Sequence, residues 1–174
     1  MIHLRLRPPS RREFYKDVYR PGVISLTRLL WGSLGGGLGL CAIALLSKAC
    51  GVGVLYPPLA ATCFIGAACV YLRVARPRQV VVGHLTSSVA GLLAVLAGDA
   101  LAWGFSPGGA VALKLGLAVA LASAFMQLFD ADHPPAAATA AIPVILPLPV
   151  EAWLLPLHMA WGAVVAVLAA LAWN

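Results

Sequence analysis

The chain contains little charge and few acidic residues. Charged residues make up 10% of its 174 residues, and only six are Asp or Glu. Signatures of several enzyme classes are also missing, since there is no Walker loop, dinucleotide fingerprint, His-Glu-x-x-His helix or Ser-His-Asp arrangement. The four cysteines form no Cys-x-x-Cys pair, which favours packing over a metal site or a disulfide frame. We therefore expect a protein that is not an enzyme and carries no metal or cofactor.

Apolar sequence takes the place of charge. Hydrophobic residues make up 61% of the chain, and several apolar runs approach the ~20 residues with which a helix spans a bilayer. This composition predicts an all-α, polytopic transmembrane protein with four to six membrane helices. The expected helices cover about 27–46, 57–72, 80–103, 110–129 and 134–146, and a last helix ends at Trp173.

The positive charges are unevenly placed. Seven of the twelve Lys and Arg residues lie in the first 28 positions, and three more are Arg73, Arg76 and Arg78. The positive-inside rule puts both groups in the cytoplasm, so we expect a bacterial inner-membrane protein with a cytoplasmic N-terminus. Residues 1–22 form a basic arm, with a short amphipathic helix over 11–19 on the membrane surface, and residues 23–174 form one transmembrane domain. Membrane lipids, and not nucleic acid, are the partners expected of these charges.

A polar stretch, Asp130-Ala131-Asp132-His133-Pro134-Pro135-Ala136-Ala137-Ala138-Thr139, separates two apolar runs. Two prolines fit the first turn of a helix, and a helix start offers free N–H groups and partial positive charge to an anion. We expect an anion to bind at His133, Pro134, Pro135, Ala136 and Thr139. His133 either contacts the anion or carries a proton with it, or it only caps the loop. Asp130 and Asp132 cap the helix or orient His133.

The same pattern occurs earlier in the chain. Tyr56-Pro57-Pro58-Leu59-Ala60-Ala61-Thr62 matches residues 133–139 at an offset of 77 residues, and the same offset places Leu38-Gly39-Leu40 on residues 115–117. This predicts two inverted repeats, about 27–104 and 105–174, whose half-helices or re-entrant starts meet near the membrane midplane. Tyr56, Pro57, Pro58 and Thr62 then form the second half of the anion site. The alternative is that Pro-Pro opens two ordinary membrane helices.

Two further ionisable residues fall in the apolar run at 80–103. His84 lies about two turns after Arg78, and Asp99 lies near the other end of the run. Intramembrane ionisable groups are costly and usually functional, so His84 is a candidate for the site. Asp99 lies either at the headgroups or, with Asp130 and Asp132, on a proton pathway.

Two blocks of the sequence resemble the HPP family of integral membrane proteins. His133-Pro134-Pro135-Ala136-Ala137-Ala138-Thr139-Ala140 is similar to its naming signature, and residues 76–85 are similar to its Pro-Arg-Asn-Val-x-x-Gly-His block. Ala137 and Gln79 stand where that family often has glycine and asparagine. The resemblance covers roughly residues 20–174 and implies four membrane spans. It also implies nitrite transport, which is known for plastid and cyanobacterial members.

The resulting hypothesis is a transporter or channel for a small inorganic anion, with nitrite as the expected substrate. Glycine-rich helix faces are compatible with a homo-oligomer. Two other classes stay open. One is a membrane scaffold or regulatory subunit without transport, and the other is a proton or cation pathway through Asp99, Asp130 and Asp132.

Overall fold

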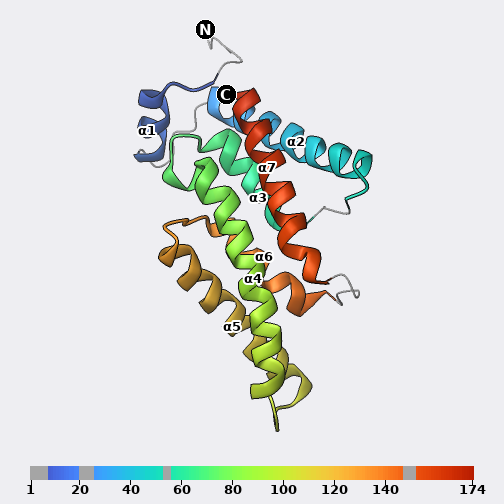
Figure 1. The fold of residues 1–174 in the computed structure, drawn as a ribbon. Coiled ribbons are helices and arrows are strands. Elements are labelled where there is room, and N and C mark those ends of the chain that lie inside the picture. Colours follow the sequence, from blue (N-terminus) through green and yellow to red (C-terminus); the bar gives the residue numbers. More distant parts are fainter. Residues whose placement is uncertain (1–7, 20–25, 53–55, 147–151) are drawn as a thin grey trace.

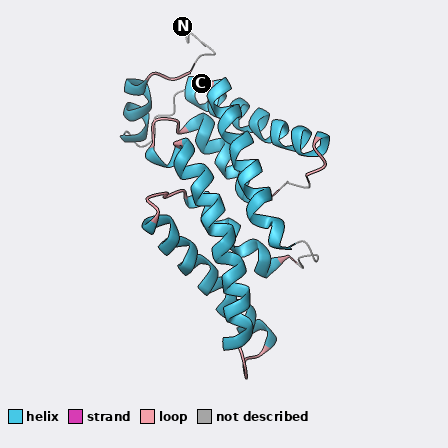
Figure 2. Cartoon of the chain, viewed as in Figure 1, coloured by secondary structure: helices cyan, strands magenta, loops and turns pink. Residues whose placement is uncertain are grey.

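The computed structural model describes residues 8–19, 26–52, 56–146 and 152–174, and within them every regular element is a helix (Figures 1 and 2). The prediction of an all-α protein is confirmed. The α-helices are α1 (Arg11–Tyr19), α2 (Leu26–Ala49), α3 (Pro57–Ala68), α4 (Pro77–Leu101), α5 (Pro107–Leu128), α6 (Pro134–Ile145) and α7 (Leu155–Trp173), with short 3-10 turns at Arg73–Ala75 and Ala152–Leu154.

Four of these helices, α2, α4, α5 and α7, are long and apolar enough to cross a membrane. The other two apolar helices, α3 and α6, have 12 residues each. At about 1.5 Å per residue, a helix of this length reaches roughly 18 Å. That is well short of the roughly 30 Å hydrocarbon core. Within the described residues, the number of helices long enough to span a membrane is therefore four, the lower end of the predicted range.

The boundaries of α3 and α4 differ from those expected. The apolar run suggested a helix to residue 72, but α3 ends at Ala68 because Cys69 leaves the helical conformation and the chain turns. Helix α4 begins at Pro77 and not near residue 80, because proline is preformed for the first helical position.

The helices follow a long-short-long order twice, as α2-α3-α4 and α5-α6-α7. Helix α6 has the bounds of α3 shifted by 77 residues at both ends. The packing repeats as well. If α2, α3 and α4 correspond to α5, α6 and α7, the contacts of α3 with α2 and α7 correspond to those of α6 with α5 and α4. The contact of α2 with α7 likewise corresponds to that of α5 with α4. In Figure 1, α4 and α7 run past each other in opposite directions, with α2 at one end of the molecule and α5 at the other. An inverted duplication predicts this arrangement.

Small residues let the central helices approach closely. Ala90, Ala94, Ala118, Ala122 and Ala140 form one buried cluster between α4, α5 and α6. At Gly91 of α4, an added Cβ would lie 2.3 Å from the carbonyl oxygen of Ala140. Helix α6 is therefore held against α4 at a separation that only glycine permits at this position.

Helix α1 has the predicted bounds, and it packs against the rest of the protein. Ser10 and Glu13 form a reciprocal cap at its start. Phe14 is fully buried and packs edge-on against Tyr71, whose hydroxyl donates to the Pro9 carbonyl at 3.0 Å. The arm is thereby attached to the loop between α3 and α4. Residues 20–22, the end of the predicted arm, lie outside the described residues.

Candidate functional site

Four buried polar side chains meet in the centre of the molecule: Thr62 of α3, His84 of α4, and His133 and Thr139 at the start and middle of α6. Each is 2% exposed or less. We call these residues the His–Thr cluster. Their positions in the chain are up to 77 residues apart, so the cluster exists only because α3, α4 and α6 pack together.

Hydrogen bonds join the cluster into one chain. Thr62 Oγ1 lies 2.7 Å from His84 Nε2 and 2.9 Å from His133 Nε2. On the far side of each ring, His84 Nδ1 lies 2.8 Å from Thr139 Oγ1, and His133 Nδ1 lies 2.7 Å from the carbonyl oxygen of Val74. Every ring nitrogen of both histidines therefore has a partner, as buried imidazoles require.

The cluster follows the internal repeat. Thr62 and Thr139 are equivalent under the 77-residue offset, and His84 holds one of them with each ring nitrogen. His84 thus lies between the two halves of the molecule, where α3 contacts α6. The predicted site residues Thr62, His84, His133 and Thr139 are brought together by the fold.

The Pro-Pro pairs start both short helices as expected. Tyr56 and His133 precede them in extended conformation, because a residue before proline is excluded from the helical region. The expected supply of free N–H groups is nevertheless absent. Prolines occupy the first two helical positions and have no N–H. The next N–H groups are already used, since Leu59 donates to the Tyr56 carbonyl and Ala136 donates to the His133 carbonyl. An anion must therefore find its donors on side chains.

The two helix starts also do not face each other. Tyr56 packs against a separate apolar cluster that includes Ile43, Leu59 and Ile142. His84 of α4 bonds Thr62 in the middle of α3 and Thr139 in the middle of α6. His133, at the start of α6, also bonds Thr62. We expected Tyr56 to meet His133, but His133 instead lies beside Thr62, and Thr62 and Thr139 are joined through His84.

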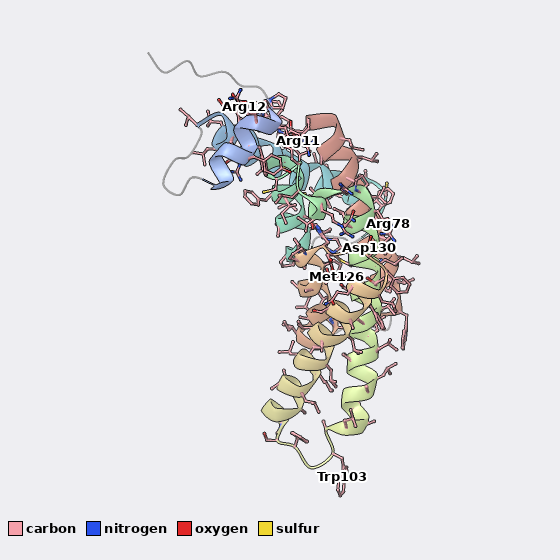
Figure 3. All side chains as sticks on the ribbon, turned by 90° about the vertical axis from the view of Figure 1, so that its left-hand side faces the viewer. Arg11, Arg12, Arg78, Trp103, Met126 and Asp130 are labelled. Atoms are coloured by element: carbon pink, nitrogen blue, oxygen red, sulfur yellow. The ribbon has the colours of Figure 1, made fainter. Side chains whose placement is uncertain are left out.

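The expected capping of α6 by an aspartate is wrong, because the cap residue is His133 and no side-chain cap bond forms. Asp130 has a positive φ of 50° and pairs with Arg73 and Arg78, whose guanidinium also donates to the Phe129 carbonyl at 2.7 Å (Figure 3). This network holds the loop before His133 against the start of α4. Asp99 pairs with Lys114 near the far end of α4. Asp132 is exposed.

Two pockets reach the His–Thr cluster. One, of about 260 Å³, has Thr62 and Val80 in its wall and is otherwise mostly apolar, with Arg76 as the charged residue that lines it. The other, of about 270 Å³, is lined by Ser123, Met126, Gln127, Asp132, His133, Pro134 and Ala137. Thr62 thus lines the first pocket and His133 lines the second, and these two residues are hydrogen-bonded to each other.

Burial dominates the electrostatics of His133. It lowers the pKa of His133 below the usual 6.5, and the hydrogen bond to the Val74 carbonyl only partly opposes this shift because it favours the charged form. Within the described residues, no group of three His, Cys, Asp or Glu side chains is placed to hold a metal ion.

Sequence reasoning missed three participants. The Val74 carbonyl is a backbone atom, so no residue pattern indicates it. Ser87 lies one helical turn after His84, and its buried hydroxyl has no partner in the part of the chain that the structure describes. The i, i+3 spacing from His84 was the available signal. Arg76, which lines the same pocket as Thr62, was assigned to the positive cluster and to the family block at 76–85, but not to the site.

The family model for the HPP transmembrane region matches residues 21–174. The match covers nearly the whole chain, and the resemblance seen in the two sequence blocks is thereby confirmed. Neither a curated protein nor a solved structure matches the chain. The chain belongs to the HPP transmembrane family.

Proposed function

We propose that this HPP-family membrane protein transports a small inorganic anion, with nitrite as the first candidate, and that the His–Thr cluster is its binding point. The observation that carries the proposal is that Thr62 lines one pocket and His133 lines the other, and that these two residues are hydrogen-bonded to each other. The choice of nitrite rests on the resemblance to plastid and cyanobacterial members, and the geometry supports the broader class of small anions.

The chemistry of the cluster suits such a ligand. The hydrogen-bond donors of the cluster are imidazole N–H groups and threonine hydroxyls, which bond to one another in this structure. An anion with several oxygens binds there by replacing one or more of these bonds. Ser87, one helical turn after His84 on α4, has a buried hydroxyl without a partner among the described residues, although it lines neither pocket. Each pocket has room for several water-sized molecules and therefore for a small inorganic anion.

Charge supports the entry of an anion at the Thr62 pocket. Arg76 lines that pocket, is exposed, and pairs with no carboxylate in the described part of the chain. Arg73, by contrast, is paired with Asp130. An unpaired guanidinium at a pocket raises the local concentration of anions by long-range attraction.

The proposed placement is the bacterial inner membrane with the basic end in the cytoplasm. Figure 3 shows Arg11 and Arg12 at one end of the molecule and Trp103 at the opposite end, with Arg78 nearer the basic end. That asymmetry supports the positive-inside orientation. Exposed leucines along α2, including Leu29, Leu38 and Leu45, supply surface for lipid or for a second copy of the chain.

The test is nitrite uptake into proteoliposomes, with nitrate, formate and chloride as competitors. We expect uptake by the wild type and its loss in Thr62→Val, which keeps the shape of the side chain and removes the hydroxyl. His158→Gln, on α7 and outside both pockets, is the matched control and should transport normally.

No flux above empty liposomes, with protein that is folded by circular dichroism and gel filtration, would contradict the proposal. Wild-type flux in Thr62→Val would exclude the cluster as the binding point. A scaffold should tolerate that substitution and show no flux in either protein. Flux of protons or cations without nitrite would favour the pathway through the aspartates.

A further inference from the structure

We propose that the His–Thr cluster takes up one proton with each anion, so that transport is electroneutral. The proton resides on Nε2 of His133, and a rotation of the Thr62 hydroxyl accommodates it. This inference rests on the proposed anion transport and specifies how that transport is coupled.

The directions of the hydrogen bonds in the cluster follow from the bond to the Val74 carbonyl, because that oxygen can only accept. The Val74 carbonyl only accepts, so His133 Nδ1 carries a hydrogen. In a neutral His133 the other nitrogen, Nε2, is then an acceptor, and Thr62 donates its single hydroxyl proton to it. Thr62 Oγ1 can then only accept from His84, so His84 carries its hydrogen on Nε2 and accepts from Thr139 at Nδ1.

A second arrangement fits the same heavy-atom positions. Thr62 Oγ1 also lies 3.1 Å from the carbonyl oxygen of Pro58, one helical turn earlier in α3. If His133 is protonated on both nitrogens, its Nε2–H donates to Thr62, and the Thr62 hydroxyl turns to the Pro58 carbonyl. Thr62 then accepts from both histidines and donates once, so each polar group of the cluster keeps a partner. The site therefore accepts one proton by a hydroxyl rotation alone.

The groups around His133 determine whether it can be protonated without a bound anion. The titratable or charged groups around His133 are His84 on α4, Cys63 next to Thr62 on α3, and Asp130 and Asp132 in its own loop. Asp130 is paired with Arg73 and Arg78. Asp132 lines the same pocket as His133, but it is exposed to solvent, which screens its charge. The residues of α5 that line its pocket (Ser123, Met126 and Gln127) carry no charge.

No buried counter-charge therefore lies beside His133 among the described residues. A lone imidazolium there, or a lone anion, would be an uncompensated buried charge, which is costly. The two together form a neutral pair.

The proton step is simple to balance. A hydronium ion in the pocket gives its proton to His133 Nε2, so an N–H bond forms, an O–H bond breaks and water is left. The anion binds beside the resulting imidazolium. On release the steps reverse, and the proton returns to water on the side where the anion leaves.

The experiment is nitrite uptake in proteoliposomes with a pH dye inside and the membrane potential clamped by potassium and valinomycin. We expect one proton to enter per nitrite, uptake driven by an alkaline interior, and a rate that does not change with the potential. In His133→Gln the side chain can still donate to Val74 and accept from Thr62 but cannot take the proton. Any nitrite flux that remains should then occur without proton entry, and its rate should depend on the membrane potential. His158→Gln is the control and should keep the coupling of the wild type.

Nitrite flux that follows the potential, without proton entry, would overturn this inference and leave the proposed function standing. No nitrite flux in the wild type would overturn both. A measurement without transport tests the site directly, namely nitrogen NMR of histidine-labelled protein in nanodiscs. Nitrite should shift the titration of His133 to higher pH, while His84 keeps its hydrogen on Nε2 throughout. An unchanged His133 titration at saturating nitrite would refute the coupling.

Discussion

Replacing Gly91 with alanine tests whether the close contact of α4 and α6 holds the His–Thr cluster together. The added Cβ would lie 2.3 Å from the Ala140 carbonyl oxygen and 2.8 Å from Pro143 Cγ, whereas ordinary contact begins at 3.4 Å. Both obstacles belong to α6, and one is backbone, so a side-chain rotation cannot relieve the clash. Helix α6 must move back by about 1 Å.

That movement reaches the cluster because Thr139 is the residue before Ala140. The hydrogen bond from Thr139 to His84 is 2.8 Å long, and a displacement of about 1 Å takes it outside hydrogen-bond range. Overpacking of this kind costs about 1–3 kcal/mol. We therefore expect Gly91→Ala to lower the free energy of unfolding by that amount and to reduce nitrite flux strongly.

The assay combines thermal unfolding in detergent with proteoliposome uptake. Gly116→Ala is the matched control, because Gly116 is also in a long apolar helix and an added Cβ there meets nothing within 4 Å. It should be neutral, or more stable by up to about 1 kcal/mol. If Gly91→Ala unfolds and transports like the wild type, the view that this helix contact positions Thr139 is wrong.

Three further predictions concern the polar groups. Thr62→Ser should retain most of the flux, whereas Thr62→Val should lose it and about 1–3 kcal/mol of stability, because it leaves buried histidine nitrogens unsatisfied; urea unfolding and uptake measure both effects. Replacing Asp99 and Lys114 together by Asn and Met should leave flux intact and change stability by about 1 kcal/mol or less, since the Asp99 side chain is 62% exposed and solvent weakens the ion pair. A loss of flux in uptake assays would support a role of Asp99 in the transport pathway. Burial lowers the pKa of His133, so its contribution to stability is complete above the unfolded value of 6.5 and is lost as the pH falls through the folded value. Melting temperatures below pH 6.5 should therefore fall more steeply for the wild type than for His133→Gln, and parallel curves would contradict this.

The sequence alone was sufficient for the features that depend on local chemistry. Apolar composition requires helices in a membrane, because backbone groups have no other partners there. Proline pairs preset the first turn, so the starts of α3 and α6 were predicted to the residue. The repeated Tyr/His-Pro-Pro pattern with its threonine gave the two equivalent halves, and the two family blocks gave the HPP assignment.

The tertiary structure decided which of those residues meet. Several polar residues of helix α4, namely Gln79, His84, Ser87 and Ser88, lie on its buried face, but the sequence does not indicate which helices that face contacts. The pairing of His84 with Thr62 and Thr139 depends on how three helices cross, and the role of Val74 depends on a backbone carbonyl. In each short helix, the first available backbone N–H donates to the carbonyl of the residue before the prolines. This too was visible only in the tertiary structure. Local patterns fix where helices start, whereas contacts between apolar helices are set by packing, and packing placed the cluster.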